Sequence, residues 1–178
     1  RGLEVVATPE PGGAPGAEEI RALLVSGDPG RWSAETEILL FTAARRDHVE
    51  KVIGPALAAG RLVICDRYVD STRVYQGGEA ARAALVDDMH ARAIGLDPDL
   101  TLLFDIAPEA AARRLVGRAG EDRFERKGAA FQETLRARFR ALAEAEPGRI
   151  RVIDAAGTED GVAARALAAL EARLEGGA

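Results

Sequence analysis

The sequence predicts a three-layer α/β domain built on a parallel sheet. Four short apolar segments alternate along the 178 residues with segments whose apolar residues recur at helical spacing. Such alternation is typical of βαβ units, in which right-handed helical crossovers join parallel strands. Two of the apolar segments, residues 62–65 and 100–105, lack polar alternation, which predicts strands buried on both faces of the sheet.

The first part of the chain predicts a strand and two helices before the strand at 62–65. Residues 3–7 form a short run rich in β-branched residues, and residues 17–25 have apolar side chains at helical spacing. Ser33 is typical of a helix N-cap, because acidic residues occupy the turn that follows it. We expect this helix to reach residue 53, and Pro55 to kink it or to start a new turn.

The second part of the chain continues the alternation after the strand at 62–65. Helical spacing and turn residues predict four helices and one further strand besides the strand at 100–105. The expected elements are a helix at 79–94, a helix from Pro108 to 116, a helix at 129–144, a strand at 150–153 and a helix at 159–174. The length suits a single domain covering residues 1–178.

Composition excludes several classes of protein. Acidic residues outnumber basic ones, 29 to 24, so the net charge of −5 gives no overall basic field for nucleic acid or an acidic membrane. No apolar run approaches the ~18 residues that span a bilayer. Cys65 is the only cysteine, which excludes an intrachain disulfide and fits a cytoplasmic protein. We assign no function to Cys65 or to His90, a solvated helix position, and expect His48 at most at a helix interface.

Carboxylates follow the predicted strands, at the sheet edge where ligands of α/β proteins bind. Asp66 comes directly after the strand at 62–65 and could hold Mg²⁺ through its waters. Arg67 follows it and could grip a phosphate with two parallel hydrogen bonds. The same pair is also compatible with an aspartate that caps a turn beside a surface arginine.

Three further segments have both a functional and a structural interpretation. Phe41 and Arg45 are four residues apart on one helix, where they could stack on a base and bond its edge, or be a core ring beside a solvated arginine. Hydroxyl and amide groups at 71–76 could read a pyrimidine, or form a polar surface loop. The arginine-rich, glycine-flanked segment 113–126 could be a mobile lid over phosphates, or a solvated loop.

Seven short segments, in order and at matching spacing, resemble the bacterial thymidylate kinase family. They are residues 10–13 (EPGG), 34–41 (AETEILLF), 44–49 (ARRDHV), 63–68 (VICDRY), 75–78 (YQGG), 98–103 (PDLTLL) and 122–125 (DRFE). The resemblance implies the fold of P-loop nucleoside monophosphate kinases. It also implies phosphorylation of dTMP to dTDP with ATP and Mg²⁺ by direct in-line transfer, a transferase step of nucleotide biosynthesis.

The resemblance implies roles for eleven residues. At the nucleoside, Phe41 would stack on thymine, Arg45 would bond its carbonyl edge, Ser71, Thr72 and Gln76 would lie near the base, and Tyr75 would press on the sugar. At the phosphates, Arg67 would hold dTMP, Asp66 would organise Mg²⁺, Glu10 would line the acceptor site, and Arg118 and Arg123 would close over ATP from a lid at 117–128. The family is homodimeric, here through the helix at 33–53, and binds neither nucleic acid nor membrane.

The sequence departs from the family pattern at its start. The phosphate loop G-x-x-x-x-G-K-[ST] does not occur in the 178 residues, so we expect the first strand, the loop and a helix, about 30 residues, to lie upstream. The printed residues alone are then not expected to phosphorylate efficiently. Pro9 stands where the family usually has an arginine, and the segment after Gly78 is short.

Two other functions remain open on the sequence alone. One is a different small P-loop kinase that acts on a nucleoside or on another monophosphate. The other is a non-catalytic, dimeric, nucleotide-binding paralogue without a phosphate loop. The missing loop favours the paralogue, whereas Asp66, Arg67 and the arginines of the lid favour an enzyme.

Overall fold

The computed structural model describes residues 2–28, 30–107, 110–111 and 129–176. The chain divides into two compact units, one ending at Asp97 and one of described residues from Pro98 onward. Each unit is described by itself, and the single domain expected from the sequence stays a prediction. The lid expected at 117–128, with Arg118 and Arg123, lies outside the described residues, as does most of the helix expected from 108 to 116.

The first unit contains one pair of parallel strands, β1 (Val5–Pro9) and β2 (Leu62–Asp66). Their register runs from Val5 opposite Leu62 to Pro9 opposite Asp66, so both strands end at the same level. The backbone N–H of Glu10 donates to the carbonyl oxygen of Asp66 at 2.9 Å, just beyond the pair. The segments that follow β1 and β2 therefore start side by side.

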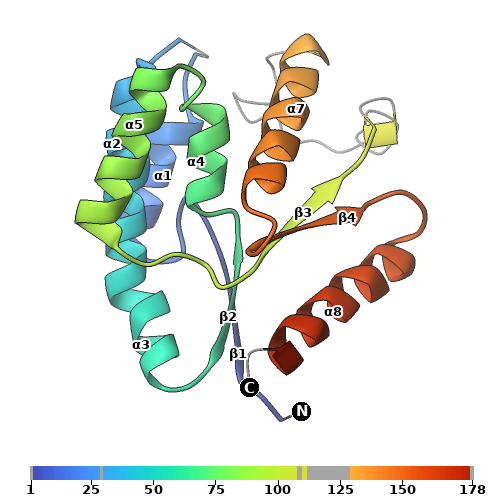
Figure 1. Cartoon of the computed structure of the whole chain (residues 1–178). Helices are drawn as coiled ribbons and strands as arrows, with labels where there is room; N and C mark the ends of the chain where they lie inside the picture. Colours follow the sequence, from blue (N-terminus) through green and yellow to red (C-terminus); the bar gives the residue numbers. More distant parts are fainter. Residues whose placement is uncertain (1, 29, 108–109, 112–128, 177–178) are drawn as a thin grey trace. The chain divides into compact units, whose positions relative to one another are not determined.

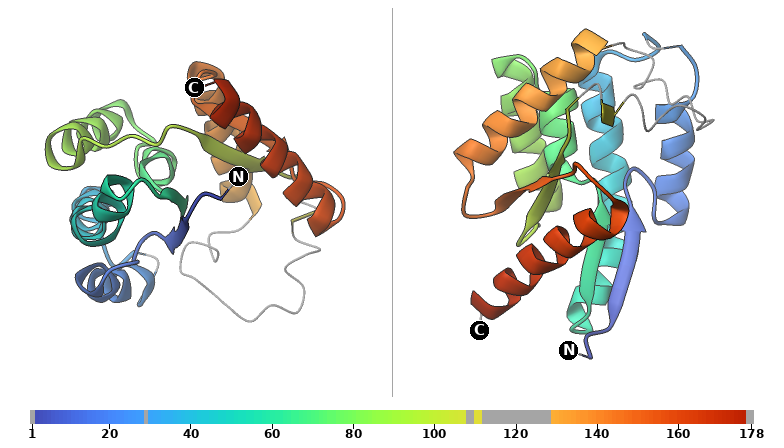
Figure 2. Two further views of the ribbon diagram at one scale, coloured as in Figure 1. Left: turned by 90° about the horizontal axis from the view of Figure 1, so that it is seen from below. Right: turned by 90° about the vertical axis from the view of Figure 1, so that its right-hand side faces the viewer.

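The described residues of this unit form five α-helices: α1 (Pro15–Val25), α2 (Ala34–His48), α3 (Gly54–Ala58), α4 (Val69–Tyr75) and α5 (Ala80–Met89). Helices α1, α2 and α5 lie to one side of the strand pair (Figures 1 and 2). The Ser33 hydroxyl accepts a hydrogen bond from the Thr36 N–H at 3.1 Å, which confirms the expected N-cap of α2.

The long helix continues past the residue where a break was expected. A π-helical turn, η1 (Val49–Ile53), joins α2 to α3, so the helical run extends through Pro55 to Ala58. The N–H of Gly54 bonds to the carbonyl of Val49, five residues back, in place of the usual four. This wider turn precedes Pro55, which has no N–H to donate, and lets the chain remain helical there.

Two small apolar clusters hold the helices of the first unit together. Ala14, Ala17 and Ala44 lie between α1 and α2, where their short side chains allow the two helices to approach closely. Ile38, Val69 and Val86 join α2, α4 and α5. Both clusters include α2, so this helix occupies the centre of the unit.

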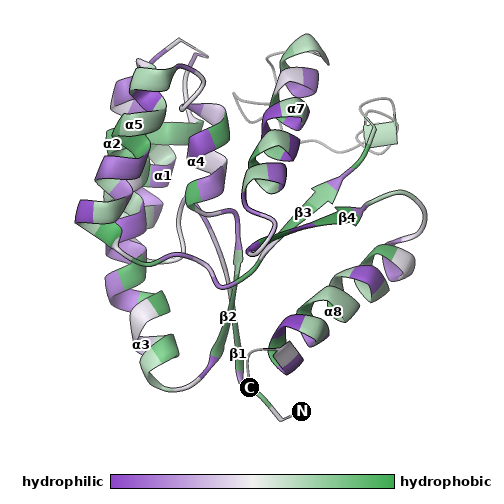
Figure 3. Ribbon diagram, in the orientation of Figure 1, coloured by the Kyte–Doolittle hydropathy of each residue, from purple (hydrophilic) through white to green (hydrophobic). Residues whose placement is uncertain are grey.

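The second unit contains a parallel pair of its own, β3 (Thr101–Asp105) and β4 (Ile150–Asp154), with α7 (Ala129–Ala145) and α8 (Glu159–Gly176). Figure 3 shows the apolar character of β3 and the mixed surface of α8. Asp105 at the end of β3 accepts two hydrogen bonds from Arg136 of α7, at 2.6 and 3.0 Å. These bonds lower the pKa of the Asp105 carboxyl.

The strands expected to be buried on both faces are not. Ile64 in β2 is 49% exposed and Phe104 in β3 is 51% exposed. Within the described residues each strand pairs with one neighbour only, and helices of the first unit lie to one side of its pair. The parallel α/β architecture is nevertheless the expected one. Over the same part of the chain, none of the helices is long and apolar enough to cross a membrane.

Candidate active site

One face of α2 carries four side chains with polar or aromatic chemistry. Glu37, Phe41, Arg45 and His48 follow one another at intervals of three or four residues, so they lie along one side of the helix. Glu37, Arg45 and His48 are buried, and Phe41 is half-buried. Phe41 and Arg45 were expected from the sequence, whereas Glu37 and His48 were not. The same spacing, extended by one turn in each direction, identifies both of them.

Arg45 lies at the centre of the polar contacts of the first unit. Its Nε donates to Oε2 of Glu10 at 2.8 Å, and its Nη2 donates to Oγ1 of Thr72 at 3.1 Å. The guanidinium carbon lies 4.9 Å from the centre of the Tyr68 ring, within cation–π distance. The structure therefore brings together three residues selected from the sequence, Glu10, Arg45 and Thr72.

His48 was expected at most at a helix interface, but its side chain contacts β1 and the loop that follows β1. Its side chain is completely buried, with Nε2 at 2.7 Å from Oγ1 of Thr8 and Nδ1 at 3.2 Å from Oε1 of Glu10. The imidazole thus joins the end of β1 to the carboxylate that holds Arg45. Sequence analysis gave His48 no such contacts.

Side chains of α1 and α2 hold the loop between β1 and α1 in place. The N–H of Gly13 donates to Glu18 at 2.8 Å, and Arg21 donates to the carbonyl of Pro11 at 2.6 Å. The N–H of Ala17, in the first turn of α1, donates to the carboxylate of Asp47 at 3.0 Å. The peptide bond before Pro11 is cis. These contacts hold the segment that directly follows Glu10.

Gln76 is oriented by a carboxylate. Its amide Nε2 donates to Oε2 of Glu37 at 2.8 Å, and a carboxylate only accepts hydrogen bonds. The amide oxygen of Gln76 is buried and has no hydrogen-bond partner in the described part of the chain. Ser71 is half-buried in the first turn of α4, one residue before Thr72. Residues 71–75 thus belong to α4, a helix packed on α2, and Gln76 caps its end, so the segment is not a surface loop.

Arg67 has an unusual backbone conformation directly after β2. Its φ angle of +67° lies in the left-handed region, which a residue with a side chain rarely adopts. The exposed guanidinium donates to the Tyr75 hydroxyl at 3.4 Å and lies 5.5 Å from the centre of that ring. Backbone strain of this kind concentrates at functional sites. Asp66 presents an exposed carboxylate at the end of the strand.

In the part of the chain that the structure describes, two places offer potential metal ligands. Oxygen, nitrogen and sulfur atoms of Glu10, His48 and Cys65 lie within 4.8 Å of one another. Burial raises the pKa of the Cys65 thiol to about 12, and Arg45 already balances the charge of Glu10, so this cluster suits a metal poorly. The exposed Asp66 fits Mg²⁺ better, since that ion is usually held by one or two carboxylates, waters and substrate phosphates.

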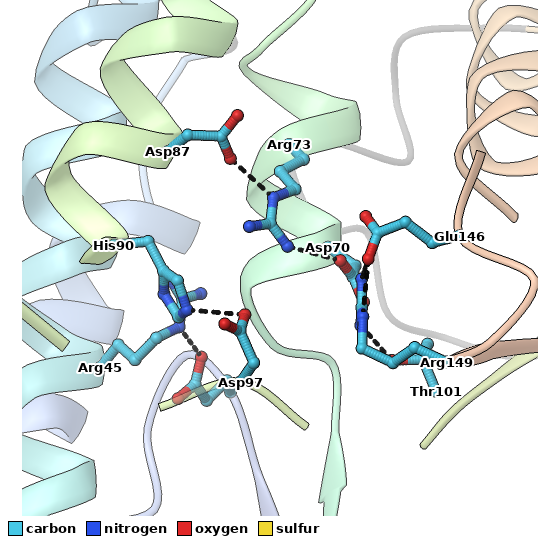
Figure 4. Close-up of polar contacts among 10 residues, drawn as sticks. Arg45, Asp70, Arg73, Asp87, His90, Asp97, Thr101, Glu146 and Arg149 are labelled. Atoms are coloured by element: carbon cyan, nitrogen blue, oxygen red, sulfur yellow. Dashed lines mark hydrogen bonds and ion pairs between the residues drawn. The ribbon is translucent and has the colours of Figure 1, made fainter. Parts of the chain in front are cut away.

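The interpretation of His90 as a solvated residue was wrong. His90 is 5% exposed, and its Nε2 lies 3.0 Å from Oδ1 of Asp97. Its ring stands at 89° to the ring of Tyr68, with the two ring centres 6.1 Å apart. Figure 4 shows this pair and, beside it, Arg73 bound to Asp70 and Asp87. Burial lowers the pKa of His90, despite the opposing effect of Asp97.

Comparison with known proteins gives a consistent result. The model of the thymidylate kinase family matches residues 1–165. The thymidylate kinase of Jannaschia sp. (strain CCS1) is 59% identical over 165 residues, which are 92% of this chain and 79% of that protein. The thymidylate kinase of Caulobacter vibrioides is 51% identical over the same shares of both chains.

A solved structure extends the similarity to the fold. The crystal structure of thymidylate kinase from Ehrlichia chaffeensis superposes with a TM-score of 0.66 at 32% identity, covering 84% of this chain and 74% of that one. The fold is that of P-loop nucleoside monophosphate kinases, as expected from the seven matching segments. The chain belongs to the thymidylate kinase family.

Proposed function

We propose that the protein phosphorylates dTMP to dTDP, with ATP as the phosphate donor. The observation that carries this proposal is the match of the thymidylate kinase family over residues 1–165, which includes every motif selected from the sequence. Thymidylate kinases use ATP as their donor. The transfer is direct and in line, so the protein acts by positioning two nucleotides and stabilising charge on the transferred group.

The base is bound at the α2 face beside Phe41, the half-buried member of that face. The Nη1 atom of Arg45 makes no hydrogen bond to the residues that the structure describes, and in the proposed complex it donates to a thymine carbonyl. Phe41, one turn earlier, supplies the aromatic ring on which the base stacks. Ser71 and Thr72 on α4, with Gln76 at the end of that helix, line the remaining edge of the base.

The sugar and phosphate of dTMP lie toward the end of β2. The contact between Arg67 and Tyr75 supports one site for both, in which Arg67 binds the phosphate while Tyr75 fills the space of a ribose 2′-hydroxyl. Glu10 starts the neighbouring loop, and its backbone is bonded to that of Asp66. We therefore assign Glu10 to the same end of the acceptor site.

The donor side of the reaction includes a divalent cation. Asp66 would hold Mg²⁺ with its waters, and the ion, when bound, screens the charge of the ATP phosphates. Arg118 and Arg123 are proposed to close over the same phosphates, although both lie outside the described residues. An arginine in that role is worth about 10³–10⁵ in rate.

The assembly and location belong to the same proposal. The two compact units form one kinase domain, and two chains pair through the long helix that begins at α2. Leu39 and Leu57, 54% and 40% exposed on this helical run, supply apolar surface for that contact. A single cysteine and nucleotide substrates fit the cytoplasm. Light scattering of the purified protein tests the pairing, because a dimer has twice the mass of the chain.

A substrate comparison tests the proposed function. The protein, expressed from its complete gene, is incubated with ATP and Mg²⁺ and with dTMP, dUMP, dCMP or thymidine, and the nucleoside diphosphate formed is measured. We expect dTMP to have the highest kcat/KM and thymidine to give no product. A higher kcat/KM for thymidine or for another monophosphate would identify a different small kinase. Binding of dTMP without any turnover would identify a non-catalytic relative.

A further inference from the structure

A buried chain of hydrogen bonds leads from β1 to Arg45 through His48. The hydroxyl of Thr8 lies 2.7 Å from Nε2 of His48, and Nδ1 of the same ring lies 3.2 Å from Oε1 of Glu10. The other oxygen of Glu10 accepts from Nε of Arg45 at 2.8 Å. His48 is completely buried, so water does not compete for these bonds.

The donors and acceptors of this chain define the proton positions. The carboxylate of Glu10 offers acceptors only, so the hydrogen bond at Oε1 requires a proton on Nδ1 of His48. In a neutral imidazole the other nitrogen is then an acceptor, and it receives the hydroxyl proton of Thr8. Each oxygen of Glu10 therefore has its own donor, one from His48 and one from Arg45.

The backbone packs directly on this chain. Gly13 has a φ angle of +81°, and a Cβ atom placed on it would lie 2.5 Å from Oγ1 of Thr8 and collide with the ring of His48. Asp47, the neighbour of His48, accepts the N–H of Ala17 at the other end of the same loop. Consecutive residues of α2 therefore hold both the start and the end of the β1–α1 loop.

We propose that His48 is a positioning residue for the nucleotide acceptor site. Its Nδ1–H holds Oε1 of Glu10, which leaves Oε2 directed at Nε of Arg45 and so orients the guanidinium toward the base. This inference rests on the proposed function, in which Arg45 bonds the thymine carbonyl. Loss of the Nδ1–H lets the carboxylate rotate and weakens the binding of dTMP, whereas the ATP site does not depend on it.

Two substitutions of His48 test whether its hydrogen-bond donor, and not the volume of its ring, sets KM for dTMP. His48→Phe fills the space but removes the donor, and His48→Asn places an amide N–H near the position of Nδ1. We expect His48→Phe to raise KM for dTMP about 10-fold or more and to leave KM for ATP within about twofold. We expect His48→Asn to restore KM for dTMP to within about threefold of the unsubstituted protein. Equal values for the two variants, or a parallel rise of both KM values, would overturn the proposal.

If His48→Phe does not fold, Thr8→Val provides a second test of the same chain of hydrogen bonds. Valine has the shape of threonine and removes only the hydroxyl that Nε2 accepts. We expect a rise in KM for dTMP smaller than that expected of His48→Phe, with KM for ATP unchanged. A selective rise in KM for ATP would contradict the proposed coupling.

Nitrogen NMR of labelled histidine gives a test that does not depend on activity. The chain has two histidines, so a His90→Gln sample assigns both rings. We expect Nδ1 of His48 to carry a proton in the protein without substrate, whatever the state of Nε2. A ring with an unprotonated Nδ1 would refute the inference even if dTMP is the substrate. Conversely, a protonated Nδ1 in a protein that does not phosphorylate dTMP would refute the proposed function alone.

Discussion

Arg45 and Glu10 form an ion pair that is almost closed to solvent, with Nε and Oε2 2.8 Å apart and side chains 3% and 5% exposed. Removing one partner of a buried pair leaves the other charge without compensation, which costs about 3–5 kcal/mol, whereas replacing both by apolar residues costs far less. The contribution of this pair to the fold is therefore measured by comparing single and double substitutions.

The first prediction concerns this comparison. We expect Arg45→Met to lower the free energy of unfolding by about 3–5 kcal/mol, and Glu10→Leu combined with Arg45→Met to cost less than the sum of the single changes. Urea denaturation measures all of them. Arg46→Met is the matched control, because Arg46 pairs with Glu50 at the surface, where both side chains are 52% exposed, and should cost about 1 kcal/mol or less. Additive costs would mean that the buried pair is not coupled.

Arg67 tests the phosphate end of the acceptor site. We expect Arg67→Ala to lower kcat/KM for dTMP roughly 10- to 100-fold, because charge-assisted hydrogen bonds to a phosphate are lost. The melting temperature should not fall, because the guanidinium is exposed and alanine keeps the same backbone requirement. Arg61→Ala, a change of another exposed arginine that pairs with Glu4, serves as the control and should retain full activity. Unchanged kinetics of Arg67→Ala would refute the assigned role.

Phe41 tests the base end. We expect Phe41→Ala to raise KM for dTMP roughly 5- to 100-fold, because stacking of a base on an aromatic ring contributes about 1–3 kcal/mol. Leu23→Ala on α1, where the side chain is 42% exposed and outside the proposed site and dimer contact, is the control for loss of an apolar side chain. Steady-state assays with varied dTMP distinguish the two variants. A larger effect of Leu23→Ala on KM would place the base elsewhere.

Gly13 tests the packing of the β1–α1 loop. Gly13 and Gly60 have similar φ angles, +81° and +72°, but a Cβ atom at Gly60 would meet nothing within 4 Å. Gly60→Ala should therefore show the cost of the conformation alone, about 1–2 kcal/mol. We expect Gly13→Ala to cost more, since the methyl group displaces His48 or Thr8. If chemical denaturation gave the same loss of unfolding free energy for both variants, the loop would accommodate the methyl group without displacing its neighbours.

His90 makes stability depend on pH. Burial lowers the pKa of His90 in the folded protein below the value of about 6.5 in the unfolded chain. As the pH falls below 6.5, the unfolded state binds the proton first, so the free energy of unfolding decreases until the pH reaches the pKa of the folded state. We expect His90→Gln to reduce this slope below about pH 6.5 in urea titrations. An unchanged slope would show that His90 does not contribute to it.

Local chemistry accounts for what the sequence predicted well. Ser33 caps α2 through the next turn of the same helix, and the strand at 62–65 is recognisable from its own apolar residues. The strand expected at 3–7 begins two residues later, at Val5, and the helical run passes Pro55. Such shifts arise because hydrogen bonds to other segments decide where an element ends.

The contacts that could not be predicted from the sequence join residues that are far apart along the chain. Glu10 and Arg45 are 35 residues apart, and Thr8 and His48 are 40 apart, so no spacing along α2 reveals which loop folds onto it. His90 has the sequence environment of an exposed helix position and is buried by Tyr68 and Asp97. The family resemblance predicted the fold and the chemistry, but the pairing of Arg45 with Glu10 required the structure.

The common face of α2 has a consequence for how this sequence can diverge. Because each residue of a helix is turned by about 100° from the one before, inserting or deleting one residue between Phe41 and Arg45 would swing Arg45 and His48 away from Glu10 while Phe41 stays in place. A single substitution changes one side chain at a time. An insertion or deletion here would separate the Phe41 ring from the Arg45 guanidinium in a single step. The spacing within 41–48 is thus expected to tolerate far less variation than its individual side chains.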